Sequence, residues 1–293
     1  MTHNTPSFGL ALPHFWKLEN MRPAPNPALR GNLFGLTPRG SEEYLKDFQV
    51  YSDERMTVTY DGFALGQADL DVWLRIIQIA GQRFIDSKPK SIIVDIKPSE
   101  FMKEIGREGG RSGRLGKNDR EWLVRSLKRL CGVITLRTPD DKKGIIGGLI
   151  KSAAWNDDQD RLIVEVDNVV GYLFSAQYTL LSTQVRKQLL GDDLSLWLHA
   201  FIMAHKAPRS RFFYNVETLM LRCRSRIAEP RKFKYKVTQK MDRLMELDPK
   251  IRGFHSWLWE KNTLHVFYTK ESAESYVPGG VAQEQLSLLS GQR

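Results

Sequence analysis

Residues 211–270 read RFFYNVETLM LRCRSRIAEP RKFKYKVTQK MDRLMELDPK IRGFHSWLWE KNTLHVFYTK. The aromatic, β-prone start predicts a strand, and the short apolar pattern after it predicts a helix. A basic turn and a long amphipathic helix follow, and the helix is expected to end before Asp248-Pro249. A polar turn then joins two strands. The predicted elements are a strand at 211–216, a helix at 217–222, a turn at 223–230, a helix at 231–247 and strands at 254–259 and 264–268.

The long helix at 231–247 has an apolar side and a polar side. With Phe233 placed at 0°, the apolar residues Val237, Met241, Leu244 and Met245 fall within about 120° of it, at 100° per residue. Lys and Arg on the other side can neutralise phosphates, and Gln can hydrogen-bond to adenine. A solvated basic helix is the plainer alternative. The preceding arginine turn and the following hairpin instead favour a winged-helix DNA-binding domain.

The basic and polar residues of this region are the predicted DNA contacts. They come from the turn, from the polar side of the helix and from the hairpin turn: Arg222, Arg224, Arg226, Arg231, Lys232, Lys234, Tyr235, Lys236, Gln239, Arg243 and Lys261.

The same order of elements is predicted earlier in the chain. An amphipathic helix at 69–83 precedes a β-branched strand at 91–96 and a short helix at 98–106. A glycine-rich basic turn at 107–117, a helix at 118–131 and strands at 132–137, 144–152 and 161–167 complete it. The later copy opens with its own helix at 192–205. The predicted fold is therefore α+β, with two tandem winged-helix domains related as a pseudo-repeat. In the first domain the predicted DNA contacts are Arg107, Arg111, Arg114, Lys117, Asn118 and Arg125.

Composition changes along the chain suggest four segments. Residues 1–40 are rich in Pro, Asn and Gly and are expected to form a flexible arm. The first winged-helix domain is placed at 41–185, including strands at 47–51 and 56–60, and the second at 186–270. The stretch at 168–190 is apolar enough to form a rigid connector. Residues 271–293, rich in Ser, Gly and Gln, are expected to be disordered.

The overall charge indicates a polyanionic partner. The 293 residues carry a formal net charge of +10, and 41% of them are hydrophobic, which is typical of a globular protein. Membrane binding is the competing use of positive charge, but no apolar run approaches the roughly 18 residues that span a bilayer. No signal peptide is recognisable, and two cysteines cannot form a disulfide framework. A cytoplasmic protein is expected.

Enzyme signatures fail at the residues that carry the chemistry. The stretch at 110–118 is similar to a phosphate-binding loop, but that motif needs Gly at position 111 and Ser or Thr at 118, where the chain has Arg and Asn. The six histidines form no metal-ligand pattern with Cys, and His199 and His205 are not at i, i+4. A nuclease would need a metal cluster or a tyrosine site. No catalytic residue, metal or cofactor is therefore expected.

Several short stretches resemble a known family. They are Ala28-Leu29-Arg30-Gly31-Asn32-Leu33-Phe34, Val58-Thr59-Tyr60-Asp61-Gly62 leading into Asp69-Leu70, Asn215-Val216-Glu217-Thr218-Leu219 and Trp257-Leu258-Trp259. Their order over roughly residues 28–270 resembles the TrfA-type plasmid replication initiators, a group that includes RepC-like initiators.

This resemblance implies a function in DNA replication. Such proteins bind direct repeats (iterons) in a plasmid origin, help to open an AT-rich region and recruit the host helicase and initiator. It implies base reading by the second domain, at Arg231, Lys232, Tyr235, Lys236 and Gln239. The first domain would contact DNA and dimerise, with inactive dimers in equilibrium with monomers. A winged-helix transcriptional repressor would share every feature through Lys270 and is the alternative.

The C-terminal segment contains a second motif. Gln285-Leu286-Ser287-Leu288-Leu289 resembles the linear motif by which bacterial proteins dock on the replicative sliding clamp. Gln285 would supply hydrogen bonds, and the leucines would fill an apolar groove. Leu289 stands where Phe is commoner, and in the family a similar motif can lie near the N-terminus instead.

Overall fold

The computed structural model describes residues 20–38, 40–84, 92–107, 116–175, 177–206 and 210–277. In these ranges the chain is a mixed helix-and-sheet structure. Its elements, in chain order, are β1 (Met21–Pro25), α1 (Asn26–Arg30), β2 (Tyr44–Ser52), β3 (Thr57–Phe63), α2 (Gln67–Phe84), β4 (Ile92–Ile96), α3 (Pro98–Glu104), α4 (Lys117–Leu130), β5 (Val133–Arg137), β6 (Gly144–Gly148), β7 (Ile150–Asn156), β8 (Arg161–Val166), α5 (Val169–Ser175), β9 (Tyr178–Ser182), α6 (Thr183–Gln188), α7 (Asp193–Ala204), β10 (Arg211–Asn215), α8 (Val216–Arg222), α9 (Pro230–Met245), α10 (Pro249–Arg252), β11 (Ser256–Glu260), β12 (Thr263–Phe267) and α11 (Lys270–Glu274).

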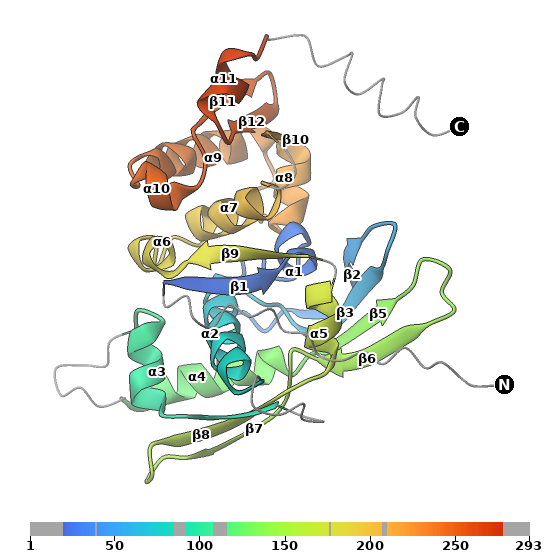
Figure 1. Cartoon of the computed structure of the whole chain (residues 1–293), viewed down its shortest axis with the longest axis vertical. Helices are drawn as coiled ribbons and strands as arrows, with labels where there is room; N and C mark the ends of the chain where they lie inside the picture. Colours follow the sequence, from blue (N-terminus) through green and yellow to red (C-terminus); the bar gives the residue numbers. More distant parts are fainter. Residues whose placement is uncertain are drawn as a thin grey trace.

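The strands form four sheets, and every strand pair is antiparallel. The sheet orders are β1-β9, β2-β3-β5-β6, β4-β8-β7 and β10-β12-β11. Figure 1 shows the β1-β9 pair lying between two halves of the molecule. The lower half holds the sheets β2-β3-β5-β6 and β4-β8-β7, and the upper half holds β10-β12-β11.

The upper half contains all the elements predicted for 211–270. The strand, the short helix, the long helix and the hairpin are β10, α8, α9 and β11-β12. The predicted apolar side of α9 is confirmed, because Phe233, Val237, Met241 and Leu244 are all buried. Met245, at the edge of that side, is only partly buried. The short helix α10 after Pro249 was not predicted.

In the lower half, the predicted strand at 144–152 is wrong. It is two strands, β6 and β7, that belong to different sheets. The chain crosses between the sheets at Leu149, which is fully buried. A Cβ atom at Gly148 would lie 2.7 Å from the Ile150 carbonyl oxygen, so glycine permits the sharp passage. The unbroken apolar run 145–150 hides this crossing, because both strands contribute to the same core.

The two three-stranded sheets have the same order of connection. In each, a first strand is followed by two main helices and a hairpin, and the last strand lies in the middle: β4-β8-β7 and β10-β12-β11. The upper set has the short α10 in addition. A longer helix precedes each set, α2 in the lower half and α7 in the upper half. In the lower half β5 and β6 are inserted before the hairpin and extend the β2-β3 sheet.

The prediction of a flexible arm over 1–40 is wrong for residues 20–38, and residues 1–19 lie outside the described ranges. Strand β1 pairs with β9, and α1 buries Pro27, Ala28 and Leu29. The prediction was wrong because it took the prolines as a sign of a flexible chain. Pro23 and Pro25 lie in a two-stranded sheet, where a missing N–H breaks no central ladder, and Pro27 lies in the first turn of α1.

The C-terminal segment also begins as ordered structure. Residues 271–277, predicted to be disordered, include most of α11, which a capping box of Thr269 and Ser272 starts. The ring of Tyr276 packs 5.3 Å from that of Phe267. Short polar helices resemble linkers in composition, so the sequence pattern missed this one. Residues 278–293, including the motif at 285–289, lie outside the described ranges.

Helix α7 joins the two halves. Trp197 and Phe201 belong to the apolar core of the upper half, whereas Ala200 and Ala204 belong to that of the lower half. The predicted connector at 168–190 folds as α5, β9 and α6. Leu181 at its centre lies in the lower core and Val185 in the upper core. The two cores therefore meet along α7 and the connector.

Asp192 fixes α9 against α7. Its carboxylate caps α7 by accepting from the backbone N–H and the hydroxyl of Ser195, at 3.3 and 2.8 Å. The side chains of Lys240 and Arg243 on α9 reach the same carboxylate at 3.0 and 2.8 Å. Burial by itself would raise the pKa of Asp192, but the hydrogen bonds from Ser195 and Lys240 outweigh it and lower that pKa.

Replacing Asp192 with Ala should destabilise the protein by about 2 kcal/mol, because the helix cap and the buried pairing are lost together. Urea unfolding monitored by circular dichroism measures this. The control is Asp242→Ala on the exposed side of α9, expected to change stability by less than about 0.5 kcal/mol. Equal effects of the two substitutions would contradict the anchoring role.

His199 makes stability depend on pH. Burial, and secondarily the charge of Arg186, lower the pKa of His199 to about 4. The folded protein keeps this ring neutral at pH 5, whereas the unfolded chain protonates it below its ordinary pKa of about 6.5. Stability is therefore lost as pH falls from about 6.5 towards 4. Between pH 7 and pH 5 the loss due to His199 should be about 2 kcal/mol.

The His199→Gln variant retains an N–H donor for the Arg252 carbonyl. In this variant the loss of stability between pH 7 and pH 5 that is due to His199 should be absent. Urea unfolding at pH 7 and pH 5 tests this. Identical losses in the variant and the original protein would show that His199 does not titrate as described.

Candidate nucleic-acid interface

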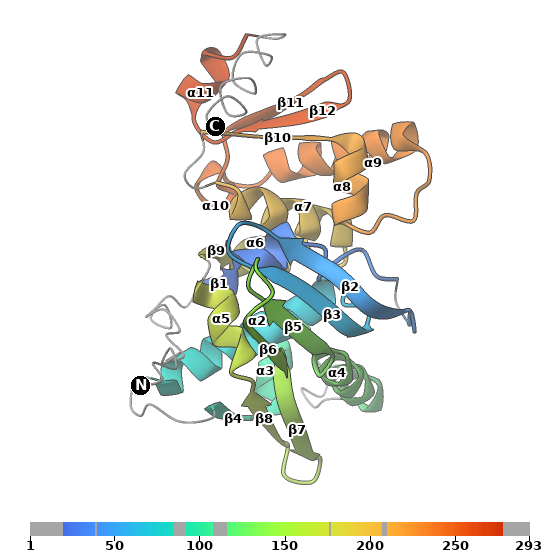
Figure 2. The ribbon, with the colours of Figure 1, turned by 90° about the vertical axis from the view of Figure 1, so that its right-hand side faces the viewer.

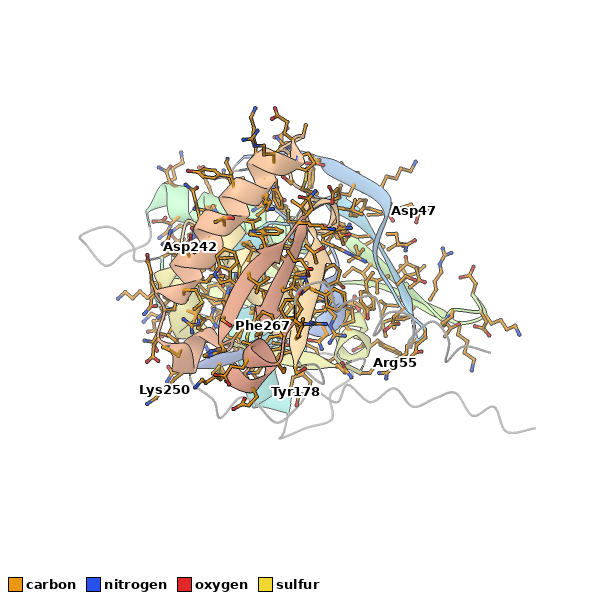
Figure 3. The ribbon with its side chains drawn as sticks, turned by 90° about the horizontal axis from the view of Figure 1, so that it is seen from above. Asp47, Arg55, Tyr178, Asp242, Lys250 and Phe267 are labelled. Carbon is orange, nitrogen blue, oxygen red and sulfur yellow. The ribbon has the colours of Figure 1, made fainter. Side chains whose placement is uncertain are left out.

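The exposed side of α9 holds the residues predicted to read bases. Arg231, Lys232, Tyr235, Lys236 and Gln239 are all exposed. The Gln239 side-chain amide donates to the Tyr235 hydroxyl at 3.0 Å, so the two side chains, one helical turn apart, orient each other. Lys232 pairs with Glu229 at 2.6 Å, whereas Arg231 and Lys236 have no partner among the described residues. Figure 3 shows α9 along one side of the upper sheet, with Asp242 near its later end.

The hairpin turn between β11 and β12 lies beside the first half of α9. The Lys234 ammonium group donates to the Lys261 carbonyl and lies 4.9 Å from the centroid of the Trp259 ring. The Trp259 indole N–H donates to the Thr238 hydroxyl at 3.0 Å. Lys261 itself is exposed. The β11–β12 turn is thus held against the predicted reading helix, and Lys234 partly serves to hold it.

The three arginines of the α8–α9 turn do not form one cluster. The Arg224 guanidinium points into the lower half, where it donates to the Leu65 carbonyl and to the Thr37 hydroxyl at 3.0 Å. Burial lowers its pKa. Arg226 is exposed and pairs with Glu43 at 3.2 Å, and Arg222 is partly exposed. Arg224 is therefore engaged inside the protein, and Arg243 is likewise engaged by Asp192.

In the lower half, α4 exposes most of its predicted contacts. Lys117, Asn118 and Arg125 are exposed, and Glu121 lies 4.0 Å from Lys117 and 3.7 Å from Arg125. The Arg107 guanidinium lies 3.6 Å from the centroid of the Trp122 ring. Arg111 and Arg114 lie outside the described residues. Figure 2 shows α4 and α9 on the same side of the molecule, at the right.

Lys128 was missed. It is exposed on α4, three residues after Arg125, so an i, i+3 spacing within the predicted helix at 118–131 would have placed it beside Arg125.

The β7–β8 hairpin of the lower half differs in charge from the β11–β12 hairpin of the upper half. The β7–β8 turn carries Asp157, Asp158 and Asp160, and Asp157 lies 3.6 Å from Arg120. Carboxylates repel phosphates, so this turn is not suited to follow a DNA backbone. The β11–β12 turn, in contrast, presents the exposed Lys261 and has no such group of carboxylates.

Metal-binding clusters and membrane-spanning helices are absent from the described ranges. In the part of the chain that the structure describes, no three His, Cys, Asp or Glu side chains converge to hold a metal ion. None of the helices in those ranges is long and apolar enough to cross a membrane.

The comparisons with known proteins show a fold. No family model matches the chain, and no curated protein matches it in sequence. Two solved structures of RctB domains 2 and 3 are similar to it, with TM-scores of 0.54 and 0.51 and 12% sequence identity. Each match covers 83% of this chain and 98% of the RctB fragment. RctB is the replication initiator of Vibrio chromosome II. The chain therefore has a fold found in a replication initiator, and the likeness does not single out the TrfA-type group.

Proposed function

We propose that this protein is a DNA-binding replication initiator built from two winged-helix domains. The observation that carries the proposal is the exposed basic side of α9 beside the Lys261 turn. The likeness in fold to RctB domains 2 and 3 supports it. The common connection order of β4-β8-β7 and β10-β12-β11 supports a repeat of the domain.

In the proposed complex the two halves have different tasks. Helix α9 enters a major groove, where Gln239 and Lys236 contact base edges and Arg231 and Lys232 neutralise phosphates. Tyr235 holds the Gln239 amide in one orientation, which lowers the entropy lost on binding. Helix α4 contacts the backbone nearby through Lys117, Arg125 and Lys128. Arg224 and Arg243 hold the helices in place and are left out of the DNA contacts.

We propose further that the bound DNA consists of iterons at an origin. The protein would help to open the adjacent AT-rich region and recruit the host helicase and initiator, with a homodimer in equilibrium with the active monomer. These steps rest on the sequence resemblance to plasmid initiators together with the fold. The segment at 285–289 remains a proposed sliding-clamp motif.

A DNase footprint on the DNA that flanks the gene tests the proposal. Protection of several direct repeats beside an AT-rich stretch is expected. A single inverted repeat over a promoter would instead identify a repressor. No protection at low salt would refute DNA binding.

Replacing Gln239 with Ala should lower the preference for the specific site by about 1–3 kcal/mol, because a base contact is lost, while binding to random DNA changes little. Lys236→Ala should also lose more specific than random binding. Fluorescence anisotropy with both duplexes gives the ratio. The control is Lys250→Ala. This residue lies in α10, after the C-terminal end of α9, and its replacement also removes one positive charge (Figure 3). Equal losses on both duplexes would remove Gln239 and Lys236 from base reading.

A further inference from the structure

One peptide unit, between Leu65 and Gly66, lies where the two halves meet. Its carbonyl oxygen accepts from the Arg224 guanidinium, from the Thr37 hydroxyl at 2.9 Å and from the Gly35 N–H at 3.1 Å. Its N–H donates to the Asp69 carboxylate at 2.9 Å. Both polar groups of this single peptide therefore bind side chains that come from different parts of the fold.

The Asp69 end of this connection holds α4. The carboxylate is buried and accepts from the Ser126 hydroxyl at 2.6 Å and from the Arg129 guanidinium at 2.6 Å. A second nitrogen of Arg129 lies 3.0 Å from the other carboxylate oxygen, so the pairing is bidentate. Bidentate pairs of this kind fix orientation as well as distance. Helix α4 is thereby tied to the start of α2.

The Arg224 end holds the turn before α9. Arg224 has a φ of 54° and sends its side chain away from α8 and α9 into the lower half. A Cβ atom at Gly35 would lie 2.4 Å from the Arg224 Nε, so only glycine leaves room for the guanidinium. The neighbouring Cys223 carbonyl accepts from the Leu36 N–H at 2.7 Å. Two adjacent residues, Cys223 and Arg224, thus fasten the turn to Leu36 and Thr37.

We propose that this connection, Arg224–(Leu65–Gly66 peptide)–Asp69–Ser126/Arg129, makes the protein sensitive to the number of base pairs between the grooves contacted by α4 and α9. The proposal rests on the proposed function, since both helices must contact one duplex. Each added base pair moves a groove by about 3.4 Å and rotates it by roughly 35°. A protein whose two helices are rigidly linked cannot follow that displacement and loses contacts at one of them.

A second, exposed link between the α8–α9 turn and the lower half cannot have this effect. Arg226 and Glu43 also join the α8–α9 turn to the lower half, but their side chains are 61% and 46% exposed. Exposed pairs exchange readily with water and contribute little to orientation. Arg226 is therefore a matched control for Arg224, because it lies in the same turn and carries the same charge.

The test needs a duplex of known sequence. A random-sequence duplex pool is selected on the full-length protein, and a hydroxyl-radical footprint on the enriched duplex marks the two protected segments. One or two base pairs are then inserted between these segments. Affinities for the enriched duplex and its insertion derivatives are measured for the original protein, Arg224→Met, Ser126→Ala and the control Arg226→Met.

For the original protein and Arg226→Met, a two-base-pair insertion is expected to weaken binding about tenfold or more. For Arg224→Met and Ser126→Ala the insertion penalty should fall to about threefold or less, although binding to the unaltered duplex is weaker. Ser126→Ala removes one hydroxyl at the opposite end of the connection, so the test stands even if Arg224→Met does not fold.

Each unfavourable outcome has a distinct meaning. Equal insertion penalties in all four proteins, or no penalty in the original protein, would overturn the inference and leave specific DNA binding intact. Failure of the selection to enrich any sequence would overturn the proposed function itself.

Discussion

Helix α7 is apolar on all sides, and the rest of the structure depends on covering both of its faces. Trp197 and Phe201 pack in the upper core, and Ala200 and Ala204 pack in the lower core. A helix of this kind is stable only when it is buried all round. Separating the halves would expose these side chains, at about 25 cal/mol for each Å² of apolar surface. The halves therefore stay together, while the polar connection from Arg224 to Asp69 contributes to the relative orientation of the turn before α9 and α4. Helix α9 is also held to the cap of α7 by Asp192.

The positive charge of the protein serves two purposes. Some arginines are paired with groups inside the folded protein. Arg186 is buried against Asp71, Arg129 pairs with Asp69, and Arg224 binds the Leu65 carbonyl. Buried guanidinium groups need such partners, because an unpaired charge away from water is very costly. The lysines and arginines on the exposed sides of α4 and α9 are available to bind an anion. The net charge of +10 therefore overstates the charge available for DNA. The positions of the basic residues indicate more about DNA binding than the total charge does.

Much of the upper half could be predicted from sequence because its signals are local. The amphipathic period of α9 and the polar turn before β12 reside within a few residues, and both were located correctly. The exposed residues of α9 followed from the same period. The lower half was harder. The apolar run 145–150 divides between β6 and the start of β7, which lie in different sheets, and the prolines in β1 wrongly indicated a flexible arm. Those outcomes depend on which distant strand offers a partner, and no local pattern records that.

The sequence by itself determined the kinds of element, the apolar sides of the helices and the concentration of basic residues around α9. These properties follow from residue type and helical or strand period. Only the tertiary structure decided which basic residues are exposed. Arg224 and Arg226 lie two residues apart in the same basic turn, yet one is sequestered by the lower half and the other faces solvent. The difference arises because Gly35 and the Leu65 carbonyl, far away in the chain, leave room and an acceptor for only one of them.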